Sequence, residues 1–236
     1  MKLHRFIYTD IDSQKVGAKF SISDLELIHQ IKNVFRMTEG GRIIICDGNY
    51  RDYVCVIEST EKKEISVLIE EIKEIRKEER EIYTFVSLIK PAKFDDMLPH
   101  LVEVGATKII PIITERTQKR NLKVERLKEI IKEATEQSGR GSNPELLDLM
   151  DFDTALKYAQ DKNLEIFIFH TKKDEVSKSE NRVDCALFVG PEGGFTEKEI
   201  QTAKEMGAQN IFLGENILRA ETAGVVATYL ASQKLI

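Results

Sequence analysis

The 236-residue sequence has no tryptophan, only four histidines and only three cysteines. The histidines are scattered, and none has a second potential ligand at helical spacing, so the sequence indicates no metal site. The cysteines, Cys46, Cys55 and Cys185, are odd in number and lack the spacing of metal ligands. We therefore expect reduced core thiols in a cytoplasmic protein, and a disulfide between Cys46 and Cys55 across a hairpin is the less favoured alternative.

Long apolar runs and an excess of positive charge are also missing. No apolar run approaches the ~20 residues of a membrane span, and the first ten residues lack the apolar segment of a secretory signal. With 35 basic and 40 acidic residues the net charge is −5, which disfavours a protein that coats bare nucleic acid with its whole surface. The candidates for local basic patches are Arg36 with Arg42 and Arg51, Arg116 with Lys119, Arg120 and Lys123, and Arg140. A solvated face is the commoner role of such patches.

The first 70 residues are mostly typical of β-structure. Two apolar-rich runs, Arg42–Cys46 and Tyr53–Ile57, flank an Asp-Gly turn, and a third run, Ile65–Ile69, follows a polar turn. Only Asp24–Phe35 has helical spacing. Its cap and apolar stripe comprise Ser23, Leu25, Ile28, Ile31 and Val34. The pattern predicts a small β-barrel with one helix.

A charged run, Glu70–Glu81, separates this region from the rest, and we place a domain boundary near Arg76. Beyond it, short apolar runs alternate with helical segments. The segments are Tyr83–Ile89, Phe94–Val104, Lys108–Ile113, Val124–Gln137, Glu165–Phe169, Cys185–Val189, Thr196–Met206, Ile211–Leu213 and Glu221–Lys234. This alternation predicts an α/β fold with a parallel sheet covered on both faces.

In an open parallel sheet, ligands bind beyond the carboxyl ends of the strands, so the loops that follow the last three predicted strands are of interest. The loop His170–Lys173 reads as an ordinary polar turn. The loop Gly190–Gly194 reads Gly-Pro-Glu-Gly-Gly, and three glycines let the backbone approach a ligand closely. A capping box at Thr196–Glu199 then starts a helix that Gly207 ends. Neither the dinucleotide fingerprint nor a phosphate loop is present.

The third loop runs from Gly214 to Thr222 and holds two apolar residues, Ile217 and Leu218, among polar ones. These two either cap the core or form a slot for a flat ring such as adenine. Arg219 and Glu221 flank the start of the last helix, where a surface ion pair and a functional role are equally plausible from sequence.

At these residues the sequence resembles the SPOUT superfamily and, within it, the RsmE-type 16S rRNA (uracil-N3)-methyltransferases. The two specific matches are FVGPEGGFTEKEI, Phe188–Ile200, and LGENILRAETAG, Leu213–Gly224. Weaker matches cover Arg36–Gly48, Leu101–Gln118 and Glu133–Leu146. Together they span nearly the whole chain in the right order.

The resemblance implies a PUA-like RNA-binding β-barrel at residues 1–72. It also implies an α/β methyltransferase domain at residues 77–236, with a deep trefoil knot. General rules of chain topology argue against knots, so only the resemblance supports one. It further implies S-adenosylmethionine as cofactor, a homodimer without metal or membrane attachment, and a uridine of 16S rRNA in the small ribosomal subunit, near the decoding centre, as substrate.

Site residues follow from the same resemblance. The cofactor residues would be Gly190, Pro191, Glu192, Gly193, Gly194, Leu213, Gly214, Ile217, Leu218 and Arg219, with His170 beside them. The catalytic residues would be Arg219, Glu221 and Arg140, the last reaching the substrate from the other subunit or a neighbouring loop.

The chemistry of uracil N3 methylation supports a role for Arg219 and for a nearby glutamate. Uracil N3 carries a proton at neutral pH, so methylation there needs a base and a cation. We expect Arg219 to stabilise negative charge on the uracil oxygens, and either Glu221 or Glu192 to orient Arg219 or accept the proton. Methylation at uracil C5 would need a thiolate, but none of the three loops holds a cysteine and Cys185 begins a buried strand.

The sequence departs from the family pattern on the substrate side. Pro99-His100 stands where the family usually has Gln-Lys, Pro91-Ala92 replaces Gly-Asp, and Ala220 replaces a common threonine. A proline inside a helix costs about 3 kcal/mol unless a kink accommodates it. Two alternatives therefore accompany the uracil-N3 assignment: a ribose 2′-O-methyltransferase of the same fold, and a non-catalytic RNA-binding or ribosome-assembly factor.

Overall fold

The computed structural model describes residues 3–11, 15–118, 121–170 and 184–236. The chain forms two compact units: Met1–Lys77 with Thr135–Asn143, and Glu78–Ala134 with Pro144–Ile236. The chain thus leaves the first unit within the charged run. The segment Thr135–Asn143, which the sequence pattern assigned to the second domain, is grouped with the first unit.

The first unit contains a five-stranded sheet in the order β1-β3-β4-β5-β2. Its strands are β1 (His4–Ile7), β2 (Lys19–Ile22), β3 (Arg42–Cys46), β4 (Arg51–Thr60) and β5 (Ile65–Glu74). The antiparallel hairpins β3–β4 and β4–β5 confirm the three predicted apolar runs as strands. The sheet also includes β1, parallel to β3, and β2, antiparallel to β5, which the sequence pattern did not reveal.

The helical segment of this unit differs from its prediction in two respects. Asp24, not Ser23, caps α1 (Leu25–His29), because its side chain accepts from the backbone N–H groups of Glu26 and Leu27. The chain continues as a π-helix, Gln30–Val34, whose wider turns rotate the buried face. Leu25, the first residue of α1, and Val34, in the π-helix, are exposed, whereas Leu27, Ile28 and Ile31 are buried.

Thr135–Asn143 is held to the first unit by specific contacts. Arg5 forms an ion pair with Asp52 at 2.9 Å and donates to the carbonyl oxygen of Arg140 at 2.6 Å. Tyr50 donates its backbone N–H to the carbonyl of Gly141 at 3.0 Å. A Cβ at Gly141 would lie 2.6 Å from the Tyr50 ring, so only glycine fits this approach. The main chain at Arg140 is therefore fixed against the first unit.

The second unit is built on a seven-stranded sheet. Its order is β12-β10-β11-β6-β7-β8, with β9 also paired to β7, and every pairing is parallel. The strands are β6 (Ile82–Ser87), β7 (Lys108–Ile113), β8 (Glu145–Leu146), β9 (Met150–Asp151), β10 (Glu165–Phe169), β11 (Cys185–Val189) and β12 (Gln209–Ile211). This confirms the predicted parallel sheet.

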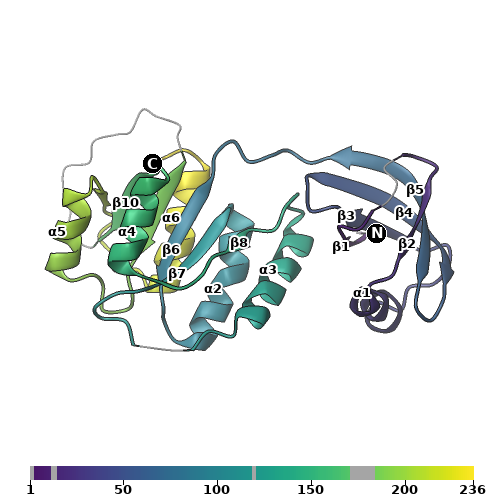
Figure 1. Cartoon of the computed structure of the whole chain (residues 1–236), viewed down its shortest axis with the longest axis horizontal. Coiled ribbons are helices and arrows are strands. Elements are labelled where there is room, and N and C mark those ends of the chain that lie inside the picture. The colour runs from purple at the N-terminus through teal and green to yellow at the C-terminus, as the bar shows by residue number, and fades with distance from the viewer. Residues whose placement is uncertain (1–2, 12–14, 119–120, 171–183) are drawn as a thin grey trace. The chain divides into compact units, whose positions relative to one another are not determined.

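Helices cover both faces of this sheet (Figure 1). The helices are α2 (Pro91–Val104), α3 (Val124–Ser138), α4 (Phe152–Asp161), α5 (Glu197–Glu205) and α6 (Ala220–Ser232). Apolar side chains of α2, α3 and α6 join the core on one face, and those of α4 and α5 join the core on the other. The α/β architecture is as predicted, although α4, which has Asp151 as its N-cap and apolar residues at helical spacing, was not among the predicted segments.

Helix α2 accommodates Pro99 without ending. It runs from Pro91 to Val104 and ends at Gly105, whose φ of 110° provides the left-handed cap. The His100 ring hydrogen-bonds the Asp96 carbonyl one turn back at 2.8 Å. The departure from the family pattern at this point therefore leaves the helix intact.

Candidate functional site

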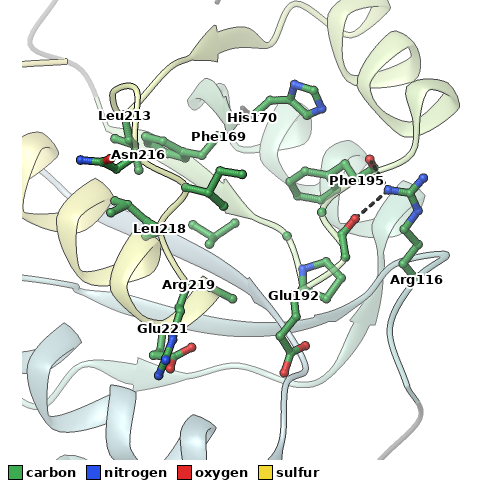
Figure 2. Close-up of a pocket in the computed structure, with 18 of the residues that line it drawn as sticks. Arg116, Phe169, His170, Glu192, Phe195, Leu213, Asn216, Leu218, Arg219 and Glu221 are labelled. Carbon is green, nitrogen blue, oxygen red and sulfur yellow. Dashed lines mark hydrogen bonds between the residues drawn. The ribbon is translucent and has the colours of Figure 1, made fainter. Parts of the chain in front are cut away.

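The strands β12, β10, β11 and β6 are neighbours in the parallel sheet, so the loops that follow them meet at one edge. A cavity of about 620 Å³ opens there (Figure 2). Its lining residues are Lys90, Lys93, Arg116, Phe169, His170, Val189, Gly190, Pro191, Glu192, Gly193, Gly194, Phe195, Phe212, Leu213, Gly214, Glu215, Asn216, Ile217, Leu218, Arg219, Ala220, Glu221 and Ala223. This volume is ordinary for a small-molecule or cofactor site.

The cavity collects the residues that the sequence singled out for cofactor binding. All eleven, from His170 to Arg219, line its wall, and Glu221 does so as well. Thr171–Lys173 of the first loop lie outside the described residues, as do Lys119 and Arg120 of the expected basic patch. Arg140 is not among the lining residues, so its role in catalysis stays a prediction.

We call Gly190–Phe195 the glycine loop. Gly194 adopts a left-handed φ of 66° and donates its N–H to the carbonyl of Pro191 at 2.8 Å, which closes a tight turn. A Cβ at Gly190 would lie 3.2 Å from the ring of Phe195, which is itself buried. Two of the glycines are thus required by the loop's own geometry.

The predicted capping box at the start of α5 is confirmed. The Thr196 hydroxyl accepts the N–H of Glu199 at 3.3 Å, and the Glu199 carboxylate accepts the N–H of Thr196 at 2.7 Å. Gly207, with φ of 87°, follows the helix end as expected. The helix therefore begins directly at the end of the glycine loop.

Arg116, on the loop after β7, also contacts the glycine loop. Its guanidinium donates to the carbonyls of Gly193 at 2.6 Å and Phe195 at 3.4 Å (Figure 2). Sequence reasoning treated Arg116 only as a member of a basic patch. Because the two loops are far apart in the sequence, no local pattern could have revealed the contact.

We call Gly214–Arg219 the C-terminal loop. Ile217 is 83% exposed, which excludes it from the core, whereas Leu213, just before the loop, packs against the core. Arg219 is the N-cap residue of α6, and its carbonyl accepts the N–H of Ala223 at 2.8 Å. Of the two roles left open for Ile217, only that of a cavity wall agrees with the structure.

The cavity has an apolar and a charged part. Phe169, Leu213 and Leu218 gather on one side, where a flat ring would find apolar contacts (Figure 2). Glu192, Arg219 and Glu221 extend toward another side (Figure 2). The site therefore offers both a ring-binding surface and side chains able to stabilise charge and to accept a proton.

Glu221 forms its ion pair with Lys93 rather than with Arg219. The Lys93 ammonium lies 3.9 Å from the Glu221 carboxylate, and Lys93 belongs to α2 while Glu221 is in the first turn of α6. Among the described residues, no Arg219–Glu221 salt bridge within 4.0 Å is present. The described residues therefore do not contain the Arg219–Glu221 surface ion pair that the sequence left open.

None of the cysteines takes part in the cavity. All three are buried and free, and Cys185 is the first residue of β11, at the far end from the glycine loop. Burial raises the pKa of the Cys185 thiol to about 11, partly offset by Arg80, which donates to its sulfur at 2.8 Å. A thiol in this state is a poor nucleophile, as expected.

The part of the chain that the structure describes holds no cluster of three or more His, Cys, Asp or Glu side chains that could bind a metal ion. No helix in those ranges has the length and apolar character to cross a bilayer.

Comparisons with known proteins agree with this geometry. A family model described as an RNA methyltransferase domain matches residues 76–232, and one described as an RNA methyltransferase PUA domain matches residues 22–70. The ribosomal RNA small subunit methyltransferase E of Bacillus subtilis is 33% identical over 224 residues, with 88% of this chain and 87% of the relative covered. The chain belongs to the ribosomal RNA small subunit methyltransferase E family.

A further relative and two solved structures are similar to this chain over nearly its whole length. The Rickettsia conorii enzyme is 31% identical, with 89% of this chain and 88% of the relative covered. A crystal structure of the Neisseria gonorrhoeae enzyme bound to S-adenosyl methionine superposes with a TM-score of 0.87 at 29% identity, covering 99% of this chain and 98% of that one. A putative methyltransferase of Legionella pneumophila, in complex with the same cofactor, gives 0.85 at 26% identity, with the same coverage.

Proposed function

We propose that this chain methylates N3 of one uridine in 16S rRNA, with S-adenosylmethionine as methyl donor. Membership of the family makes the chain an rRNA methyltransferase that uses this cofactor. The observation that carries the finer proposal is the cavity. It joins the glycine loop to a charged side formed by Glu192, Arg219 and Glu221.

The residues present fit the cofactor. Phe169, Leu213 and Leu218 supply apolar surface for the adenine, and the glycine loop brings main-chain groups close to the cavity. A Cβ at Gly190 would lie 3.2 Å from the Phe195 ring, so a side chain there would crowd the start of the loop. Bound here, the cofactor would supply a methyl group activated by a sulfonium.

The chain's own residues would then prepare the uracil. Arg219, the residue just before α6, would supply a permanent cation for the negative charge that develops on the uracil oxygens once the N3 proton leaves. A carboxylate must accept that proton within hydrogen-bond reach. Methyl transfer itself mainly requires that the base be held in line with the donor.

Two carboxylates remain candidates for that acceptor. Glu192 extends from the glycine loop, and Glu221 lies in the first turn of α6 beside Lys93. Either would accept the proton, while the other would orient Arg219. Lys93 forms an ion pair with Glu221 at 3.9 Å. Substituting each glutamate in turn distinguishes the proton acceptor from the residue that orients Arg219.

The cellular location, the RNA-binding role of the first unit and the oligomeric state belong to the same proposal. Substrate recognition in the small subunit would place the protein in the cytoplasm, with the first unit helping to hold the RNA. The homodimer and the trefoil knot are part of the proposal because the resemblance to the family implies them. So is the approach of Arg140 to the substrate, from the other subunit or from a neighbouring loop.

Reverse transcription across small-subunit rRNA tests the proposal. N3 methylation blocks Watson–Crick pairing, so synthesis should stop at one uridine in cells that contain the gene. The stop should vanish in a deletion strain and return when purified protein and S-adenosylmethionine are added to assembled subunits. A stop that survives deletion would contradict the assignment. A mark detected only at low nucleotide concentration would instead indicate ribose 2′-O methylation, and no mark at all would indicate a non-catalytic assembly factor.

A further inference from the structure

The glycine loop is held from outside by the loop after β7. Arg116 donates to the carbonyls of Gly193 and Phe195, at 2.6 and 3.4 Å. The buried carboxylate of Glu199, 8% exposed, accepts the N–H of Glu115 at 2.8 Å while it also caps α5. Arg116 thus bonds main-chain groups of the glycine loop, and Glu199 of the adjoining helix α5 bonds the main chain next to Arg116; we call this pair of contacts the clasp.

The loop that carries Arg116 is itself ordered. Thr117 donates its N–H to the carbonyl of Thr114 at 3.0 Å, and its hydroxyl accepts the N–H of Thr114 at 2.9 Å. The two threonine hydroxyls are also 2.8 Å apart, and Thr114 is buried. Arg116 therefore projects from a fixed turn rather than from a pliable segment.

The clasp acts on the part of the glycine loop that has the most conformational freedom. Gly193 and Gly194 are adjacent, and glycine loses more backbone entropy on ordering than any other residue. A carbonyl that accepts from Arg116 fixes the rotation of its peptide unit. The methylene groups of Arg116 also pack on Gly193, where an added Cβ would lie 3.3 Å from Cδ of the arginine. The guanidinium thus orders the loop in advance of ligand binding.

We propose that Arg116 is a positioning residue for the cofactor loop: it holds Gly190–Phe195 in its binding shape, without acting on the RNA. This inference rests on the proposed use of S-adenosylmethionine. It assigns the arginine a role different from the phosphate contact that its basic neighbours would suggest. Charge-assisted hydrogen bonds of this kind are stronger than neutral ones, so their loss should be measurable in cofactor affinity.

Calorimetric titration of S-adenosylmethionine into the full chain, without RNA, tests this role. Arg116→Ala should weaken binding about tenfold. Arg116→Lys, which keeps the charge and one donor, should recover part of the loss. Arg126→Ala is the matched control, because it removes an arginine paired with Asp95 at 2.7 Å on the same unit, and it should bind as the wild type does. Arg116 is exposed, so its removal should leave the fold intact.

Steady-state kinetics supply the second readout. Arg116→Ala should raise the KM for S-adenosylmethionine and leave the KM for small-subunit RNA within about twofold of wild type. Unchanged cofactor affinity with a raised KM for RNA would overturn the proposal and make Arg116 an RNA contact. A wild-type chain that fails to bind S-adenosylmethionine would overturn the proposed function and this inference with it. A wild type that binds, beside an Arg116→Ala variant that binds equally well, would overturn the inference alone.

Discussion

The two loops that form the cavity wall are built differently. The glycine loop is closed by a hydrogen bond between Gly194 and Pro191 and is held by Arg116 and by the capping box of α5. The C-terminal loop is largely exposed, and within the described ranges no hydrogen bond joins residues 214–218 to another segment. Substitutions in the first loop should therefore act through its order, and those in the second through direct contact with ligands.

Substitution of Arg219 should lower methylation activity most, because this residue ends the C-terminal loop and lines the cavity. Arg219→Ala should lower the kcat of rRNA methylation about 10²- to 10³-fold, the usual loss when a group that stabilises developing charge is removed. Arg219→Lys should retain part of the activity. Methyl transfer to assembled subunits measures both variants, and wild-type turnover by Arg219→Ala would contradict the role assigned to this residue.

Substitution of the two candidate proton acceptors, Glu192 and Glu221, should have the next largest effect on turnover. Glu192→Gln or Glu221→Gln should reduce kcat about 10²-fold, whichever removes the proton acceptor, while the other substitution should have a smaller effect. Single-turnover methyl transfer by each variant identifies the base, because only the variant that lacks the acceptor should lose the chemical step. Two variants with wild-type turnover would show that neither carboxylate accepts the proton.

Gly194 tests the order of the glycine loop. Gly194→Ala places a side chain at a φ of 66°, a conformation that costs L-residues roughly 1–2 kcal/mol. Cofactor affinity should fall about tenfold or the midpoint of thermal unfolding should drop, depending on whether the loop relaxes. Ile217→Ala in the C-terminal loop is the control, because Ile217 is 83% exposed and its truncation should leave stability unchanged. Equal effects of both substitutions on stability would remove the distinction between the loops.

Substitution of Cys185 should change methylation activity least. Its pKa of about 11 means that the thiol stays protonated throughout the neutral range and ionises only as the pH approaches 11. Cys185→Ala should therefore keep methylation activity within about twofold at pH 6–9, even if the buried site loses some stability. Loss of activity in a folded Cys185→Ala variant would point to a thiolate mechanism instead.

Local signals in the sequence predicted most of the second unit. The apolar runs of β6, β7, β10 and β11, the capping box at Thr196 and the stop at Gly207 depend on neighbours a few residues apart, and the structure confirms them. The predicted run Ile211–Leu213 overlaps the edge strand β12 only at Ile211. The two cavity loops were found for the same reason. Each contains unusual residues directly after a buried strand, at the edge where parallel sheets bind ligands.

Features that depend on distant contacts were not predictable. The segment Thr135–Asn143 returns to the first unit through contacts with residues more than 90 positions away. The contact between Arg116 and the glycine loop spans 77 positions. Composition and periodicity carry no information on such pairs, so Arg116 looked like any other surface cation.

Nucleoside mass spectrometry of 16S rRNA identifies the methylated atom of the substrate. Small subunits from a deletion strain would be incubated with the purified chain and S-adenosylmethionine that carries a labelled methyl group. We expect labelled 3-methyluridine, about one per subunit, and its loss with Arg219→Ala. Label in 5-methyluridine or in a 2′-O-methylated nucleoside, or no label in the RNA at all, would contradict N3 methylation by this chain.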